Sequence, residues 1–294
     1  MFGQKNPPRR TLGSALGVGV AGFLLVVGAC GGSAGLGDQR DASAADAGVA
    51  LDSGSVQPDA CVESCNAVTP SYPSVQPNGG LGNITMYATG PSAGGACNYG
   101  TTSVLYYAAM SVNVAPGDLQ GQWQGGRICG QCVEVTTFTA QGPAAVVVRI
   151  MDKCPDGDCG IDLGGSAPAA IMLDGFGRYD GTWRFVSCAG HAEVSDGAPS
   201  LFVSAGSNAW WSRVQVRNPP WAVASIAWQD PAGSAQGAFP YAADPENTFE
   251  VPAEVLQSPA TLITILVHYT DGNTATVQLG PSQLAAANTS YPLD

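Results

Sequence analysis

Short runs of β-branched and aromatic residues, each ended by glycine or proline, limit most strongly what this chain can fold into. Between residues 72 and 190 such runs lie at 83–89, 132–138, 144–152 and 182–188. Glycine (39) and proline (21) are frequent, and only 12% of the 294 residues are charged. This mixture favours short strands and turns over long helices.

Two segments refine this pattern. The three consecutive valines 146–148 predict a strand that is buried on both faces or lines a closed barrel. The segment 166–174 is the best helix candidate, because Ser166 is suited to the N-cap and Pro168 to the first turn.

The C-terminal third of the chain alternates more regularly. Six strands are expected, at 200–206, 210–218, 223–230, 247–251, 261–272 and 274–280. In the second of them, Val214 and Val216 should face one way and Arg213, Gln215 and Arg217 the other. The pattern predicts a β-sandwich.

The N-terminus has the form of an export signal. Lys5, Arg9 and Arg10 precede the apolar stretch 12–28, and the sequence VVGAC places Cys30 where a bacterial lipobox has its lipidated cysteine. A transmembrane anchor or ordinary secretion is the alternative. We expect residues 1–30 to be a lipoprotein-type signal, so that the lipid holds the chain at the cell envelope or surface; without it, the protein would be extracellular.

Residues 31–71 are small, polar and acidic, which predicts a disordered tether. Without residues 1–29 the chain keeps 8 basic against 23 acidic residues, a net charge of −15. So acidic a surface excludes nucleic acid as a partner and is compatible with a neutral polymer.

An exported chain holds its cysteines as disulfides. Eight remain after Cys30, an even number that fits four bridges without fixing their connectivity: Cys61, Cys65, Cys97, Cys129, Cys132, Cys154, Cys159 and Cys188. The CGQC sequence at 129–132 would indicate a redox or zinc site in a cytosolic protein. Only two histidines are present in the chain, so structural bridging is preferred and no metal is expected.

Five motifs, in their order and spacing, resemble the expansins, specifically bacterial expansin-like proteins, over about residues 80 to 290. They are GNITMYATG…GGACNYG (82–100), CGQCVEV (129–135), IMDKCPDGDCGIDL (150–163), GTWRFVSC (181–188) and NAWWSRVQVRN (208–218). The resemblance implies an all-β chain: a six-stranded double-psi β-barrel over 72–192, then an immunoglobulin-like carbohydrate-binding sandwich over 197–294. It also implies loosening of plant cell walls without hydrolysis and without a cofactor.

The resemblance also implies the disulfide pairing of the barrel. Its pattern joins Cys97 to Cys129, Cys132 to Cys188 and Cys154 to Cys159. The fourth pair, Cys61–Cys65, rests on proximity in the sequence alone.

The same resemblance assigns the residues of a groove in the barrel. Thr85 and Tyr87 match groove positions on the first strand, and Asp152 matches the aspartate that ends the middle strand. Asp162 matches the aspartate on which activity in the family most depends. Cys154 stands where the family has an aromatic residue in the turn between the two aspartates.

Family-45 glycoside hydrolases share this barrel and need an acid and a separate base. Asp162 matches their acid, but Ala88 and Thr89 stand where their base should be. Asp152 is a possible substitute base that would come from the same side of the groove; a supporting role and a turn cap are its other interpretations. For Asp162 the alternative to function is a helix-leading or turn aspartate.

Trp210 and Trp211 are adjacent, and adjacent residues of a regular strand point to opposite faces. That rule predicts one core and one surface ring. The resemblance implies instead that both are exposed and stack on glucosyl units.

The third aromatic residue of this surface is missing at its expected position. Glu246 stands there, so we expect Phe239 or Tyr241 to replace the missing aromatic residue, and we expect Phe249 in the core.

Three functions follow from these residues. The first is a monomeric, non-hydrolytic protein that binds cellulose or another β-1,4-glucan of the plant cell wall. The second is a weak endoglucanase or a peptidoglycan lytic transglycosylase, and the third is a binding module with an inert barrel. Release of soluble sugar or anhydromuropeptide, measured against wall creep, separates them.

Overall fold

The structure is a computed structural model that describes residues 79–112, 122–173, 177–242 and 244–294. The expectations for the signal, the tether, Cys30, Cys61 and Cys65 lie outside these ranges. No helix within the described ranges is long and apolar enough to span a membrane.

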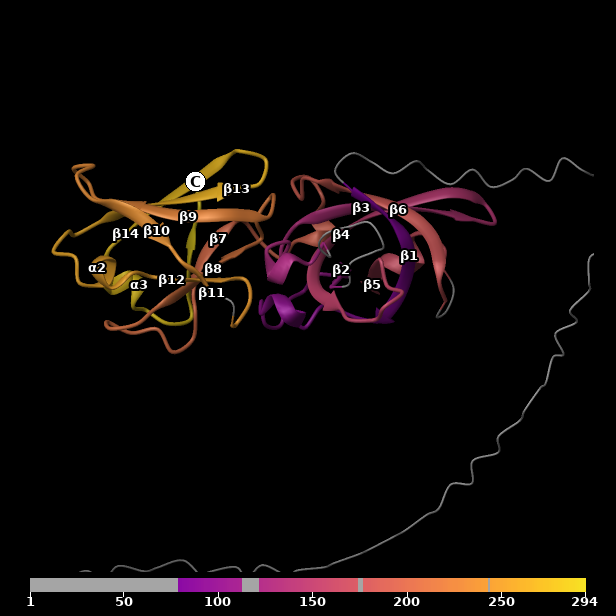
Figure 1. The fold of residues 1–294 in the computed structure, drawn as a ribbon, viewed down its shortest axis with the longest axis horizontal. Coiled ribbons are helices and arrows are strands. Elements are labelled where there is room, and N and C mark those ends of the chain that lie inside the picture. The colour runs from indigo at the N-terminus through magenta and orange to yellow at the C-terminus, as the bar shows by residue number, and fades with distance from the viewer. Residues whose placement is uncertain (1–78, 113–121, 174–176, 243) are drawn as a thin grey trace, which may run out of the picture. The chain divides into compact units, whose positions relative to one another are not determined.

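A closed barrel forms the first part of the described chain (Figure 1). Its strands are β1 (Gly79–Ala88), β2 (Tyr106–Ser111), β3 (Cys132–Thr139), β4 (Gly142–Cys154), β5 (Ile161–Gly165) and β6 (Tyr179–Val186), in the order β1-β5-β2-β4-β3-β6. The pairs β1–β5 and β2–β4 are parallel and the other four are antiparallel. The predicted six-stranded mixed barrel is confirmed, and its crossed order brings β5 between β1 and β2.

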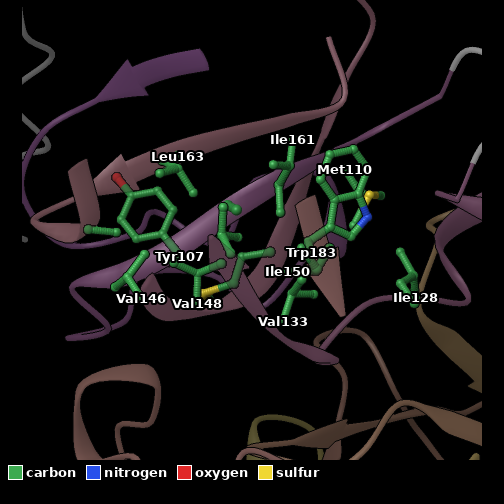
Figure 2. Packing of buried hydrophobic residues seen from close by; sticks show 14 of the residues in the cluster. Tyr107, Met110, Ile128, Val133, Val146, Val148, Ile150, Ile161, Leu163 and Trp183 are labelled. Carbon is green, nitrogen blue, oxygen red and sulfur yellow. The ribbon is translucent and has the colours of Figure 1, made fainter. Parts of the chain in front are cut away.

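Apolar side chains from all six strands fill the barrel (Figure 2). Val146 and Val148 are buried there, whereas Val147 packs partly against the disulfide of Cys132 and Cys188. The valine run therefore lines a closed barrel and has neighbours on both faces, which explains why it does not alternate with polar residues.

The second part of the chain is a sandwich of two antiparallel sheets, again as predicted. One has the order β10-β9-β13-β14 and the other β11-β12-β8-β7-β15. The strands are β7 (Ser200–Val203), β8 (Arg213–Arg217), β9 (Val223–Gln229), β10 (Gln236–Phe239), β11 (Tyr241–Ala242), β12 (Thr248–Glu250), β13 (Ile263–Tyr269), β14 (Thr274–Leu279) and β15 (Thr289–Pro292). Val214 and Val216 point into its core, as the alternation predicted.

Helices are few and short. The described α-helices are α1 (Ala167–Ala170), α2 (Ala253–Leu256) and α3 (Pro281–Leu284), and the 3-10 turns are η1 (Gly95–Cys97), η2 (Gln124–Gly126) and η3 (Ala192–Val194). The predicted helix at 166–174 is thus a single turn, and Ser166 occupies its N-cap without a side-chain hydrogen bond.

Three disulfides join Cys97 to Cys129, Cys132 to Cys188 and Cys154 to Cys159. This is the pairing that the resemblance implied. Cys129 and Cys132 belong to different disulfides, so the CGQC sequence contributes one cysteine to each of two bridges. All three bridges lie in the barrel or just after it.

Barrel and sandwich exchange buried hydrogen bonds. The Gln215 side chain on β8 donates to the carbonyl of Cys97 at 2.9 Å, and Asn247 donates to the same oxygen at 3.0 Å. From the other direction, the amide of Ala222 donates to Oε1 of Gln131 at 3.0 Å. Gln215 faces away from the sandwich core, and its buried amide donates a hydrogen bond to the barrel, which explains why a polar side chain is buried there.

Candidate functional site

Four neighbouring strands carry one row of residues across the barrel wall. Thr85 on β1 pairs with Asp162 on β5, Asp162 pairs with Ala109 on β2, and Ala109 pairs with Asp152 on β4. Residues opposite one another in a ladder share a face of the sheet. The row therefore collects three of the four predicted groove residues, and the small side chain of Ala109 separates the two aspartates.

Asp162 is a half-buried carboxyl in direct contact with Thr85. The hydroxyl of Thr85 donates to its Oδ1 at 2.7 Å. Burial raises the pKa of Asp162, the hydrogen bond from Thr85 lowers it in part, and the charges of Asp156 and Asp152 add to the increase. The balance is a half-buried carboxyl that holds its proton more firmly than an exposed aspartate does.

The Cys154–Cys159 disulfide lies against this pair. Sγ of Cys154 is 3.9 Å from Oδ2 of Asp162, and Sγ of Cys159 is 3.8 Å from the Thr85 hydroxyl. These two cysteines and Asp162 have the proximity of metal ligands. Because both sulfurs are used in the disulfide, the one remaining carboxylate does not make a metal centre.

Asp152 is engaged by backbone. Its Oδ1 accepts hydrogen bonds from the amides of Ala96 and Lys153, both at 2.8 Å. Gly95, at φ 47°, brings the η1 turn so close that a Cβ there would lie 2.5 Å from Cγ of Asp152. Asp152 therefore anchors the turn that leads to Cys97, which favours the supporting and turn-anchoring interpretations over that of a free base.

Tyr87 lies at an irregularity of β1 between Met86 and Ala88, and its side chain packs against Ala109 and the Cys154–Cys159 disulfide, beside the row. Its ring meets Tyr107 edge to face at a centroid distance of 5.9 Å. Burial, reinforced by the negative charge of Asp152, raises the pKa of Tyr87 well above its ordinary range. The phenol is therefore a neutral hydrogen-bond donor beside the two aspartates.

The row offers the chemistry of one acid with neutral hydrogen-bonding neighbours. Ala88 and Thr89, at the position of the hydrolase base, supply no carboxylate, and Asp152 is held by two amides. An inverting glycosidase needs a base that activates water on the far side of the sugar ring. The row gives such a water no dedicated base.

The sandwich carries the two predicted tryptophans in the bend before β8. Trp210 is 80% exposed and Trp211 is 43% exposed. The side chain of Asn208 accepts hydrogen bonds from both of their amides, at 2.9 and 3.2 Å. Because the bend is not a regular strand, the alternation rule does not apply, and the arrangement with one core ring is not the observed one.

One face of Trp211 is covered by a cation. The guanidinium carbon of Arg213 lies 5.1 Å from the ring centroid, and Arg213 also pairs with Glu250 at 2.8 Å. This contact holds the ring in place, so that a ligand stacking on it would find it already ordered.

Of the two residues predicted to replace the third aromatic residue, Phe239 is wrong, and Tyr241 stays a prediction. Phe239 is only 3% exposed and belongs to the sandwich core, as does Phe249. Tyr241 has Arg127 over its ring at 4.2 Å, meets Phe249 edge to face, and donates to the carbonyl of Gly125 at 2.9 Å. Burial raises the pKa of Tyr241. Phe239 therefore offers no face to a sugar, and Arg127 covers one face of the Tyr241 ring.

Two residues that the sequence reasoning did not assign have clear roles here. Asn208 orders the tryptophan pair, and an asparagine two residues before an aromatic pair is a recognisable turn signal. Glu246, which replaces the missing aromatic, pairs with Lys153 at 3.2 Å and lies 3.4 Å from Nε1 of Trp123. Glu246 therefore links the sandwich to the barrel, and no local sequence pattern predicts these contacts.

Comparisons with known proteins agree with this geometry. Residues 107–188 match the sequence model of the Barwin family, a region that runs from β2 to the second cysteine of the Cys132–Cys188 bridge. A mutant Clavibacter michiganensis expansin solved with cellohexaose has 19% identity and a TM-score of 0.53, and covers 73% of this chain and 95% of its own. The protein is expansin-like in its fold.

The apo structure of Clavibacter michiganensis expansin gives the same result, with 20% identity, a TM-score of 0.52 and the same coverage. Curated protein sequences give no match. The resemblance first drawn from five sequence motifs is thus confirmed for a barrel followed by a sandwich.

Proposed function

We propose that this expansin-like chain binds β-1,4-glucan through Trp210 and Trp211 and loosens contacts between glucan chains without cleaving them. The observation that carries the proposal is the exposed, ordered tryptophan pair. Flat aromatic rings stack on the apolar faces of sugar rings and bury large areas at little entropic cost. The Clavibacter expansin was solved with cellohexaose, which supports a glucan ligand for the shared fold.

The barrel supplies the second half of the proposal. Asp162, Thr85 and Tyr87 present a carboxyl, a hydroxyl and a neutral phenol in and beside the row. Such groups compete well for the hydrogen bonds that hold glucan chains together. Since the row lacks a dedicated base, displacement of one chain from another fits the groove better than hydrolysis does.

Sedimentation with insoluble cellulose tests the binding. The double variant Trp210→Ala, Trp211→Ala should lose most of the affinity that wild type shows, by about 100-fold, since each stacked ring contributes about 1–2 kcal/mol. Leu262→Ala is the matched control, because Leu262 is also an exposed apolar residue of the sandwich, 42% exposed. Wild-type affinity in the tryptophan double variant would overturn the assignment.

A single-acid cleavage of glycan strands is the second candidate function, and one observation favours it. Burial raises the pKa of Asp162, as a general acid requires. Release of reducing sugar from cellulose, or of anhydromuropeptides from peptidoglycan, would establish it if Asp162→Asn abolished the release. Wall creep with no such release supports the non-hydrolytic function.

The location proposed for the protein is the cell envelope, through lipid on Cys30. The support is the lipobox sequence after a basic and apolar leader. Incorporation of labelled palmitate should occur in wild type and fail in Cys30→Ala, which should also move the protein from the membrane fraction to the medium. A membrane-bound, unlabelled variant would favour a transmembrane anchor instead.

A further inference from the structure

A pocket of about 290 Å³ has no part in the groove or in the tryptophan surface. It is lined by the loop that follows Cys97, by β4, by the segment 196–198 and by the ends of the sandwich strands. None of the residues assigned above to glucan binding lines it. Two arginines do, Arg149 from β4 and Arg217 from the end of β8.

Arg149 is a buried cation. It is 2% exposed, and its Nε and Nη1 donate to the carbonyls of Val194, Gly130 and Pro219 at 2.5, 3.3 and 3.2 Å. Within the described residues, no carboxylate lies at ion-pair distance from it. Three carbonyl dipoles offset part of the cost of burying the guanidinium but do not neutralise its charge.

Arg217 is the second cation without a counter-ion. Its guanidinium carbon lies 3.5 Å from the ring centroid of Phe202. Its Nε is buried and has no hydrogen-bond partner among the described residues. No ion pair joins Arg217 to a described carboxylate either. A buried guanidinium Nε without a partner, in a residue that lines a cavity, is an unused donor.

Asp196 is the one carboxylate among the lining residues. Its charge acts on both arginines, though it lies outside ion-pair distance of each. The lining therefore carries two positive charges and one negative charge, within a chain whose net charge is −12. The excess positive charge at this pocket points to an anion.

The other lining groups describe the rest of that ligand. The hydroxyls of Thr101, Ser200 and Ser290 and the amide of Asn218 line the same pocket. Such groups hydrogen-bond hydroxylated ligands. A volume of about 290 Å³ lies at the lower end of ligand pockets, which suits one sugar ring better than a polymer segment.

We propose that this pocket binds a sugar acid, a hexuronic acid, with its carboxylate against Arg149 and Arg217 and its hydroxyls against the threonine, serine and asparagine groups. Guanidinium groups recognise carboxylates through paired, charge-assisted hydrogen bonds. The site is independent of glucan binding, because it shares no residue with the groove or with the tryptophan surface.

Isothermal titration of the full chain with galacturonate and glucuronate tests this, with glucose and inorganic phosphate as comparison ligands. We expect saturable binding of a uronate, none of glucose and weaker binding of phosphate. Absence of saturable uronate binding would overturn the proposal. Phosphate binding as tight as that of the uronate would overturn it too, since a simple oxyanion site would then account for the pocket.

Two near-isosteric variants should change the uronate affinity in opposite directions. Arg217→Gln should weaken uronate binding about 10-fold or more, the effect of losing a charge-assisted hydrogen bond. Asp196→Asn should tighten it. Opposite directions cannot both come from unfolding. Arg184→Gln is the control, since Arg184 is an exposed arginine paired with Glu134 outside the pocket. Unchanged affinity in Arg217→Gln, or the same loss in Arg184→Gln, contradicts the assignment.

Discussion

The barrel and the sandwich stabilise themselves by different means. The barrel contains or adjoins all three disulfides of the described chain, and its assigned side chains are half-buried. The described sandwich has no disulfide, encloses a core between its two sheets, and leaves Trp210 80% exposed. The barrel therefore holds its assigned polar side chains half-buried, whereas the sandwich holds its two tryptophan rings at the surface.

This difference explains how the two regions divide the proposed work. Side chains that compete for particular hydrogen bonds need a rigid wall, because a small displacement removes the bond. Stacking on a flat polymer needs only ordered, exposed rings, because the attraction is non-directional and scales with area.

Loss of the Cys132–Cys188 bridge should be the most damaging change to the barrel. The bridge spans 56 residues, so its loss should cost about 4 kcal/mol of folding free energy by chain entropy. Loss of Cys154–Cys159, which spans 5 residues, should cost about 2 kcal/mol. Chemical denaturation of the two alanine double variants measures the difference.

The same experiment compares the two regions directly. In a reducing agent, the barrel should unfold at lower denaturant concentration than the sandwich, giving two transitions. A single transition, unchanged by reduction, would show that the disulfides do not distinguish the regions.

Asp162→Asn should remove wall creep by at least about 10-fold while cellulose binding stays within about twofold of wild type, because the carboxyl lies in the barrel and the rings lie on the sandwich. Creep and sedimentation assays on the same preparation measure the split. Asp158→Asn is the control, since Asp158 lies in the turn before β5, its side chain is 77% exposed, and its carboxylate forms an ion pair with Arg178 at 3.8 Å. If Asp162→Asn lost cellulose binding as strongly as it lost creep, the proposed division of work between barrel and sandwich would be wrong.

The raised pKa of Asp162 gives a pH dependence with a defined sign. Because its folded pKa lies above the ordinary 3.8, folding favours the protonated form. This stabilisation is complete below that ordinary value and is lost as the pH rises through the folded pKa. Asp162→Asn should therefore be more stable than wild type at pH 7 and lose that advantage as the pH falls towards 4, as measured by denaturant midpoints.

Thr85→Val tests the cause of the Asp162 pKa shift. The hydroxyl of Thr85 lowers the pKa of Asp162, so its removal should raise that pKa further. The pH at which wild-type creep declines should then move upward in the variant. A downward shift would mean that Thr85 does not donate to the carboxylate.

Glu246→Gln should have the smallest effect. The Lys153–Glu246 pair is exposed by 45% and 21% on its two sides, and such pairs contribute about 0–1 kcal/mol. The free energy of unfolding should fall by less than about 1 kcal/mol and the cellulose affinity should not change. A loss of creep with unchanged stability would show instead that the tie between barrel and sandwich matters for function.

Much of the architecture was predictable from local patterns. Valines 146–148 indicated a strand enclosed on both faces, and the runs that became β3 and β4 lie within about two residues of their predicted bounds. Strands β2, β5, β10, β11 and β15 were missed. The two tyrosines of β2 are followed by AAMS, β5 ends in two glycines, and β10, β11 and β15 are two to four residues long, so their local strand preference is weak. Their place is decided by the strands they pair with, not by their own residues.

The residue types of the site can be read from the sequence alone: an even set of cysteines, an aspartate with no base at 88–89, and two tryptophans after Asn208. Which of these residues meet depends on the tertiary structure. The row from Thr85 to Asp152 depends on the crossed strand order, and the burial of Phe239 depends on the packing of two sheets. Arg149 and Arg217 lie 68 positions apart in the sequence, yet both line one pocket. Burial and strand pairing are properties of the folded chain, so no local sequence pattern predicts this pocket.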